Sequence, residues 1–245
     1  MSWQWPEEPI SPPWRTLSVI VPIYNEYETL TEIVRRIRDV GLSALRLTTE
    51  IVLVDDGSTD GTRESLPGLA ELPGVRVFLL PRNRGKGAAV RVGIENATGD
   101  FLLVQDADLE YDPRDYPTLL RPILEGRSSV VYGSRFLGEH KAMYYWHQVG
   151  NKLLTMVANI LYNTTLTDME TCYKLCTREV AHSFTLKQHR WGFDPEMTAK
   201  ILKRGHRIYE VPISYNGREF DEGKKINWRD AFVVIISLVR YRFTE

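Results

Sequence analysis

The 245-residue sequence has few cysteines, no excess of either charge and no long hydrophobic run. Its two cysteines, Cys172 and Cys176, are too few for a disulfide framework, so we expect buried thiols in a reducing compartment. The 31 basic and 32 acidic residues give a net charge of −1, which provides no positive field for nucleic acid. The longest apolar run, residues 231–239, is about half of a membrane span. These absences exclude a disulfide-rich fold, a nucleic-acid partner and a spanning helix.

Apolar, β-branched runs alternate with helical patterns through the first half of the chain, which is the order of a largely parallel α/β sheet. The predicted strands cover residues 17–23, 50–54, 75–80, 101–104, 129–132 and 207–213. The predicted helices cover residues 28–40, 86–97, 147–162 and 195–203. We expect an irregular Pro/Trp-rich arm over residues 1–16, one domain over 17–228 and an apolar, basic helix over 229–245.

Polar clusters follow several of the predicted strands. Residues 55–61 (DDGSTDG), 105–108 (QDAD) and 133–135 (GSR) come directly after strands. The carboxyl ends of parallel strands meet at one edge of an open sheet, where ligands bind. The sequence therefore predicts a ligand site at this edge.

The segment Gly85-Lys86-Gly87 matches neither of the standard glycine-rich nucleotide motifs. It lacks the spacing of a P-loop, and it follows the third strand where a dinucleotide fold would use the first. Its amides and its lysine can still meet a phosphate or a ribose at the start of a helix.

Asp106 and Asp108 lie one residue apart after a predicted buried strand. At that spacing both carboxylates can reach one divalent cation, and Mg²⁺ takes its other ligands from water and substrate phosphates. The alternative is a solvated acidic loop, because Glu110, Asp112 and Asp115 follow closely.

Taken together, these segments resemble the family 2 glycosyltransferases of the GT-A fold, and within them the polyprenyl-phosphate (dolichol-phosphate-type) sugar synthases. The similar segments are residues 21–26 (VPIYNE), 54–61 (VDDGSTDG), 83–87 (NRGKG), 106–108 (DAD), 133–136 (GSRF), 167–174 (TDMETCYK) and 211–215 (VPISY), with a basic loop after them. They occur in the family's order over roughly residues 17–228. The resemblance implies a GT-A fold, with an open mixed sheet flanked by helices.

The resemblance also assigns expected roles. The nucleotide-binding set it implies is Pro22, Tyr24, Glu26, Asp56, Gly85, Lys86, Asp106 and Lys224. Within this set Asp56 would contact the base or ribose, and Lys224 and the adjacent Lys225 would reach phosphate from a loop. Asp106 and Asp108 would hold Mg²⁺ or Mn²⁺ against the diphosphate. Arg135 and Arg218 would pair with phosphate oxygens through the planar guanidinium.

The general base is not determined by these motifs. Asp168 and Glu196 are the candidates, because attack by a hydroxyl needs a group that takes its proton. An acceptor that is already an ionised phosphate needs no strong base, and Asp194 then serves as the N-cap of a helix that Pro195 opens.

The expected activity is a metal-dependent, inverting transfer of a hexose (mannose or glucose) from a nucleotide sugar, GDP-mannose or UDP-glucose, to a polyprenyl or dolichyl phosphate. Inversion is implied by the family alone. Two alternatives stay open: a transferase acting on a soluble or cell-surface glycan, and a non-catalytic sugar-nucleotide-binding subunit of a membrane complex. We expect a cytoplasmic location, with peripheral contact with the cytoplasmic membrane face and homo-oligomer formation both compatible with the sequence.

Overall fold

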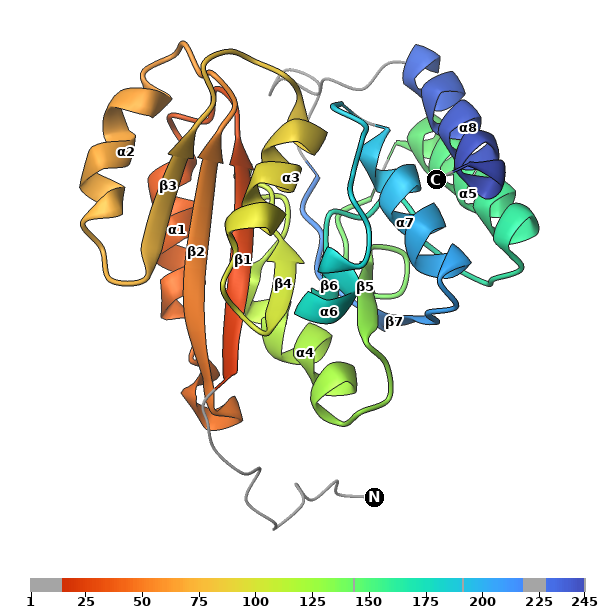
Figure 1. The fold of residues 1–245 in the computed structure, drawn as a ribbon, viewed down its shortest axis with the longest axis horizontal. Coiled ribbons are helices and arrows are strands. Elements are labelled where there is room, and N and C mark those ends of the chain that lie inside the picture. The colour runs from red at the N-terminus through yellow and green to blue at the C-terminus, as the bar shows by residue number, and fades with distance from the viewer. Residues whose placement is uncertain (1–14, 143, 191, 218–227, 245) are drawn as a thin grey trace.

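A seven-stranded mixed sheet forms the centre of the molecule (Figure 1). The computed structural model describes residues 15–142, 144–190, 192–217 and 228–244. The strands are β1 (Arg15–Ile23), β2 (Leu47–Asp55), β3 (Val75–Leu79), β4 (Phe101–Val104), β5 (Val130–Ser134), β6 (Lys174–Thr177) and β7 (Ile208–Pro212). Their spatial order is β3-β2-β1-β4-β6-β5-β7, and every pairing is parallel except the two made by β6.

Helices flank this sheet, and three of them lie together beyond β5 at the right of Figure 1. The helices are α1 (Leu30–Asp39), α2 (Thr62–Ala70), α3 (Lys86–Asn96), α4 (Tyr116–Leu124), α5 (Tyr145–Tyr162), α6 (Arg178–His182), α7 (Phe193–Lys203) and α8 (Trp228–Phe243). Short 3₁₀ turns cover Leu42–Leu45 and Pro113–Asp115. Helix α8 packs against α5 and α7, so the C-terminal helix is joined to the rest of the fold.

Two apolar cores hold these layers together. The main core lies around the sheet, where consecutive residues of β1 are buried because helices cover both faces. Helix α1 contributes Leu30, Ile33, Val34 and Ile37, the i, i+3, i+4, i+7 stripe of an amphipathic helix. A smaller cluster joins α5 to α8 and consists of Leu154, Ala158, Met169, Val234 and Leu238.

The predicted α/β class with an open mixed sheet is confirmed, and β4 and α3 lie within one residue of their predicted bounds. Both cysteines are buried and free, as expected. Strand β1 begins at Arg15, inside the segment assigned to the N-terminal arm, and residues 1–14 of that arm lie outside the described residues. The remaining corrections concern the second half, where the sequence patterns are weaker.

Two predictions in that half were wrong. Tyr145 and Trp146 belong to α5 and not to the loop before it. Helix α7 begins at Phe193, so Asp194 lies inside its first turn and does not cap it. Helices α2, α4 and α6 and strand β6, which lie in both halves of the chain, were not predicted.

Candidate functional site

The polar clusters that follow the strands meet at one edge of the sheet. Strands β1, β2, β4 and β5 run parallel, so their carboxyl ends lie together, and antiparallel β6 brings its first residue, Lys174, to the same edge. The loops that begin after Ile23, Asp55, Val104 and Ser134 therefore surround one region. This is the edge that the sequence predicted.

The acidic loop after β4 is held from below by a buried glutamine. The Oε1 atom of Gln105 accepts hydrogen bonds from the hydroxyls of Tyr116 (2.8 Å) and Tyr173 (2.7 Å). The Nε2 atom of Gln105 donates to the carbonyl of Asp106 at 2.9 Å. These bonds fix the backbone from which Asp106 and Asp108 project. The sequence placed Gln105 and Tyr173 in quoted segments but gave no supporting role to them or to Tyr116, because their contacts join segments far apart in the chain.

Asp106 forms an ion pair with Lys86, the first residue of α3, with 2.5 Å between Nζ and Oδ1. Burial lowers the pKa of Lys86, but the nearby negative groups, Asp106 first among them, together outweigh burial and raise that pKa above its ordinary value. The structure thus brings together two residues that sequence analysis placed at the site. Lys86 stays charged at physiological pH, which places a fixed cation beside the carboxylates.

Asp108 lies in the turn that follows, where its Oδ1 accepts the Glu110 amide at 3.1 Å. No group of three or more His, Cys, Asp or Glu side chains that could hold a metal occurs within the described residues. Asp106 and Asp108 are two carboxylates one residue apart, which fits a hard cation that completes its coordination with phosphate oxygens and water.

Asp56 holds the loop between β3 and α3. Its carboxylate is 2% exposed and accepts the amides of Arg84 (2.8 Å) and Gly85 (2.6 Å). Burial raises the pKa of Asp56, while these two hydrogen bonds lower it. The neighbouring Gly57 has φ +77°, and a Cβ there would lie 2.6 Å from the Arg82 carbonyl carbon. The hydrogen bonds to Asp56 and the close packing against Gly57 together hold the 82–85 loop beside the site.

The glycines at the start of α3 allow a second loop to approach. A Cβ on Gly85 would collide with the carbonyl of His189, and one on Gly87 would lie 2.6 Å from the carbonyl of Gln188. The His189 carbonyl also accepts the Ala88 amide at 3.2 Å. The 188–189 loop therefore covers part of the start of α3. Of the groups predicted to contact phosphate there, the side chain of Lys86 is the one that this loop leaves as the candidate.

The segment after β1 is tied to the segment after β2. The Asn25 side chain accepts the Thr59 amide at 2.8 Å, and the Asn25 amide donates to Ser58 Oγ at 3.0 Å. Pro22 pairs in register with Val54 inside the sheet, and Tyr24 is half-buried at the strand end. The Glu26 amide donates to Thr62 Oγ1 at the start of α2, so Glu26 lies farther from the strand ends than Tyr24.

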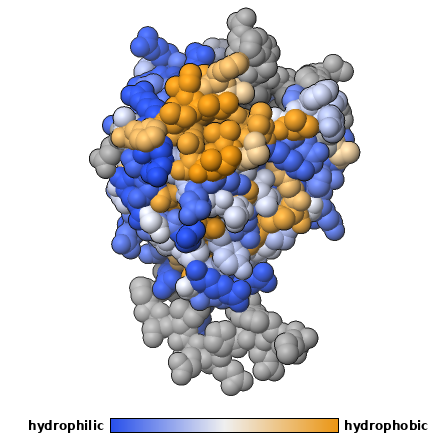
Figure 2. Space-filling view, turned by 90° about the vertical axis from the view of Figure 1, so that its right-hand side faces the viewer, coloured by the Kyte–Doolittle hydropathy of each residue, from blue (hydrophilic) through white to orange (hydrophobic). Residues whose placement is uncertain are grey.

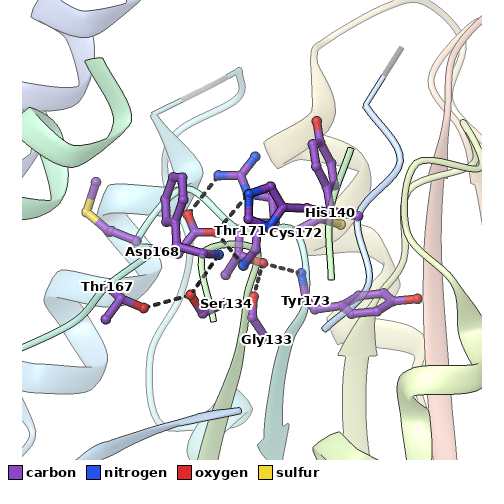
Figure 3. Close-up of polar contacts among 12 residues, drawn as sticks. Gly133, Ser134, His140, Thr167, Asp168, Thr171, Cys172 and Tyr173 are labelled. Carbon is purple, nitrogen blue, oxygen red and sulfur yellow. Dashed lines mark hydrogen bonds and ion pairs between the residues drawn. The ribbon is translucent and has the colours of Figure 1, made fainter. Parts of the chain in front are cut away.

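Arg135 and Asp168 form a bidentate ion pair after β5. Figure 3 shows Asp168 close to Thr167 and Ser134. The Nε and Nη2 atoms of Arg135 each lie 2.7 Å from an Asp168 oxygen, and the Arg135 amide donates to Asp168 at 3.0 Å. Asp168 is fully buried and Arg135 keeps 10% of its side chain exposed. Burial lowers the pKa of Arg135, but the Asp168 charge raises it well above its ordinary value. With both oxygens engaged, Asp168 positions the guanidinium, and the role of a base does not fit these contacts.

Glu196, the other candidate base, is also engaged in holding the fold. It pairs with Lys200 at 2.6 Å and accepts the amides of Lys187 (2.9 Å) and Gln188 (2.7 Å). Asp194 pairs with Lys174 at 2.5 Å in the interior. Arg218, Lys224 and Lys225 lie outside the described residues.

Glu170 is a carboxylate at this site that sequence reasoning did not single out. Its Oε1 is buried and has no hydrogen-bond partner among the described residues. Burial, together with the nearby charge of Asp194, raises the pKa of Glu170 to about 8, while Lys174 and Arg135 lower it. Glu170 is thus protonated in the folded protein at neutral pH.

Glu170 should make the stability of the protein depend on pH. Its pKa is about 8 when folded and near the ordinary 4.5 when unfolded, so between these values the folded state holds the extra proton. We expect stability to fall as pH rises from about 5 to 9. The variant Glu170→Gln should lack this decline and exceed the wild type in melting temperature at pH 9. Thermal unfolding of both proteins across this range tests the assignment, and parallel pH profiles would contradict it.

Comparison with known proteins points in one direction. The profile described as "Glycosyl transferase family 2" matches residues 18–184. The chain is 31% identical over 227 residues to "Glycosyltransferase AglJ" of Haloferax volcanii, covering 91% of this chain and 70% of that protein. It is 28% identical over 215 residues to the "Undecaprenyl-phosphate 4-deoxy-4-formamido-L-arabinose transferase" of Klebsiella pneumoniae, covering 87% of this chain and 63% of that relative. The chain therefore spans less than two thirds of the second relative's length.

Solved structures share the fold. Glucosyl-3-phosphoglycerate synthase from Mycobacterium tuberculosis, in complex with Mn²⁺, UDP and phosphoglyceric acid, superposes with a TM-score of 0.69 at 21% identity. The match covers 94% of this chain and 80% of that one. At this identity the likeness shows the fold, which is GT-A. Across the described residues, every helix falls short of the length and apolarity needed to cross a bilayer.

Proposed function

This chain belongs to glycosyltransferase family 2, and from that premise we propose that it transfers a hexose, mannose or glucose, from a nucleotide sugar to a polyprenyl phosphate. The proposal includes dependence on Mg²⁺ or Mn²⁺, inversion at the anomeric carbon and action at the cytoplasmic membrane face. The observation that supports it best is the convergence of Asp106, Asp108 and Lys86 with Arg135 on one edge of the sheet.

The acidic and basic groups at this edge suit a sugar diphosphate. Asp106 and Asp108 would hold the divalent cation, which supplies a Lewis acid to the leaving diphosphate. Lys86 adds a fixed positive charge beside them, 2.5 Å from Asp106. Asp56 supports the 82–85 loop and thereby shapes the nucleoside side of the site. These residues bind and orient the donor.

The acceptor side favours a phosphate nucleophile. Arg135 keeps 10% of its side chain exposed and is held in place by Asp168, and its guanidinium is suited to pair with an anionic oxygen. An ionised phosphate needs no strong base, and both predicted bases, Asp168 and Glu196, have their oxygens engaged. The undecaprenyl phosphate in the name of the Klebsiella relative supports the same acceptor class.

One observation favours a second candidate, a transferase acting on a glycan hydroxyl. Glu170 has a pKa of about 8 and a buried oxygen without a described partner, which are properties of a group that exchanges a proton near neutral pH. If the acceptor is a hydroxyl, Glu170→Gln should lose turnover. If the acceptor is a phosphate, this variant should retain it.

The Asp56→Ala variant should bind the nucleotide more weakly. Without the carboxylate, the amides of Arg84 and Gly85 lose their partner and the 82–85 loop is released from the site. Hydrogen bonds to a charged group contribute about 1.5–3 kcal/mol, so we expect an affinity loss of roughly 10- to 150-fold. Isothermal titration with the nucleotide measures this loss, and an unchanged affinity would contradict the role of Asp56.

A donor panel tests the proposal. Thermal unfolding is followed with GDP-mannose, UDP-glucose and a UDP-pentose, each with and without Mn²⁺ or Mg²⁺. A ligand at 100 times its dissociation constant should add about 2.7 kcal/mol to stability. A metal-dependent rise in melting temperature with one nucleotide sugar supports the donor site and identifies the nucleobase of the donor. Binding without turnover on any acceptor would favour the non-catalytic subunit, and no shift with any donor would contradict the proposal.

A further inference from the structure

Helix α5 exposes an apolar stripe along its outer side. The stripe consists of Val149, Leu153, Met156 and Ile160. Their spacing of four, three and four residues places them on one face of the helix. Ile160 is 73% exposed, while Leu154 and Ala158 on the inner side are buried against α8.

Helix α8 repeats this arrangement. Its exposed stripe consists of Phe232, Ile236, Val239 and Phe243, again four, three and four residues apart. Ile236 is 64% exposed, whereas Val234 and Leu238 are buried against α5. Helices α5 and α8 thus pack against each other through their inner residues, and both outer stripes stay exposed.

We call the two stripes together the α5–α8 face. Figure 2, which views the molecule from the right-hand side of Figure 1, shows a continuous hydrophobic area on this side. Apolar residues scattered singly over a surface are ordinary, but a contiguous patch of this kind marks a binding surface.

The charges around the α5–α8 face are basic. Lys152 of α5 and Arg240 and Arg242 of α8 are exposed. The sequence of α5 contains no acidic residue, and that of α8 contains one, Asp230, in its first turn. An apolar surface with a basic rim is complementary to a bilayer that carries anionic headgroups.

Exposed aromatic side chains lie at the start of α5. Tyr145 and Trp146 are among the most exposed large side chains of the protein. Rings with an apolar body and a polar tip favour the boundary between headgroups and acyl chains.

A groove borders the exposed stripe of α5 and is lined in part by the residue that follows Arg135. It has a volume of about 350 Å³ and is lined by Phe136, Leu137, Lys152 and Met156, among others. Met156 belongs to the exposed stripe of α5, and Phe136 directly follows Arg135. The groove therefore extends from the apolar stripe to the residue that follows Arg135, and its lining also includes the polar side chains of Thr155, Asn159 and Thr167.

We propose that the α5–α8 face docks on a membrane surface that contains anionic lipid. This inference deepens the proposed function and rests on it for the role of the groove, which would admit the hydrocarbon part of the acceptor toward Arg135. A second copy of the chain fits the face less well. Two-fold pairing would bring the same basic rims together, and like charges across an interface are unfavourable.

Vesicle co-sedimentation of the full chain tests the docking. The probes are vesicles of phosphatidylcholine alone and of phosphatidylcholine mixed with phosphatidylglycerol. Each cation near an anionic surface strengthens binding severalfold, so we expect at least about ten-fold tighter binding to the mixed vesicles. Equal binding to both kinds of vesicle, or binding to neither, would overturn the proposal.

Matched variants locate the docking surface. The double variant Ile160→Glu with Ile236→Glu should lose at least about ten-fold in vesicle binding, because it places carboxylates on the apolar face. The control is Leu79→Glu on β3 at the opposite edge of the sheet, where the native side chain is 55% exposed. Loss in the control as well would show that net charge, and not the α5–α8 face, controls binding. Melting temperatures confirm that each variant is folded.

A second pair of variants keeps the test independent of the apolar change. Arg240→Gln with Arg242→Gln should remove most of the preference for phosphatidylglycerol, and an unchanged preference would contradict the charge argument. Light scattering of the wild type without vesicles is expected to show a monomer. A dimer that the Ile160/Ile236 variant disperses would overturn the docking in favour of a second copy.

Failure of the docking and failure of the proposed function have different signatures. Turnover on polyprenyl phosphate in detergent, without any vesicle binding, would reject the docking and leave the function standing. Vesicle binding without turnover on polyprenyl phosphate would support the docking and reject the proposed function.

Discussion

Replacing Asp108 with alanine is expected to reduce metal-dependent sugar transfer by at least about 10³-fold, as losing a key group that stabilises developing charge does. Asp108 follows β4 at the edge where the site residues meet, one residue from Asp106. Lys86 already neutralises part of the charge of Asp106. Loss of the Asp108 carboxylate should therefore lower the affinity for the cation the most. Initial rates over a range of Mn²⁺ or Mg²⁺ concentrations measure the effect.

The fold should survive this change, because Asp108 lies in a surface turn after β4, where its carboxylate accepts the Glu110 amide, and contributes nothing to the apolar core. Asp108→Asn can keep that bond and should still lose activity, which separates cation binding from turn structure. The matched control is Asp112→Ala, an acidic residue of the same loop that pairs with Arg114. Full activity in both Asp108 variants would remove the metal assignment.

The second large effect concerns stability. Asp168→Ala leaves Arg135 buried with its charge uncompensated, and removing one partner of a buried ion pair costs about 3–5 kcal/mol. Asp168 also accepts the Arg135 amide, so the turn after β5 loses its anchor as well. Denaturant unfolding of the variant and the wild type measures the loss.

Two further variants separate the structural and functional parts of this pair. Glu32→Ala breaks an exposed ion pair on α1 and should leave the unfolding midpoint unchanged. Arg135→Lys keeps the charge but loses the bidentate contact. It should therefore raise the KM for the acceptor, while its unfolding midpoint should fall less than that of Asp168→Ala. An Asp168→Ala protein as stable as the wild type would show that the pair is not buried as described.

The sequence predicts the parallel half of the fold well for a physical reason. Strands such as residues 101–104 are uniformly apolar because they are buried on both faces, and α3 begins directly after Gly85. The acidic and basic residues that follow these strands converge because the strands are parallel. Local pattern and global topology agree there, so the edge at which the site lies could be predicted.

The remainder depends on contacts between distant segments. Helices α2 and α4 contain Pro67 and Pro122, which conceal their helical pattern, and β6 has four residues, too few to show a strand pattern. Asp168 and Glu196 looked like free carboxylates in the sequence. Asp168 pairs with Arg135, 33 residues away, and Glu196 accepts backbone amides from another loop, contacts that no local pattern indicates. Only the pairing of Glu196 with Lys200, four residues on, has a spacing that the sequence shows. Glu170 is distinguished by burial alone, and burial is a property of the folded chain.

The central claim is tested most directly by a transfer assay with purified protein. The nucleotide sugar that gives a metal-dependent thermal shift is mixed with polyprenyl phosphate in detergent, and the lipid product is detected by mass spectrometry. We predict a glycosylated polyprenyl phosphate with an inverted anomeric carbon, formed when Mn²⁺ or Mg²⁺ is present and absent with Asp108→Ala. Product on a soluble glycan and none on the lipid phosphate, with the same donor and metal, would contradict the account.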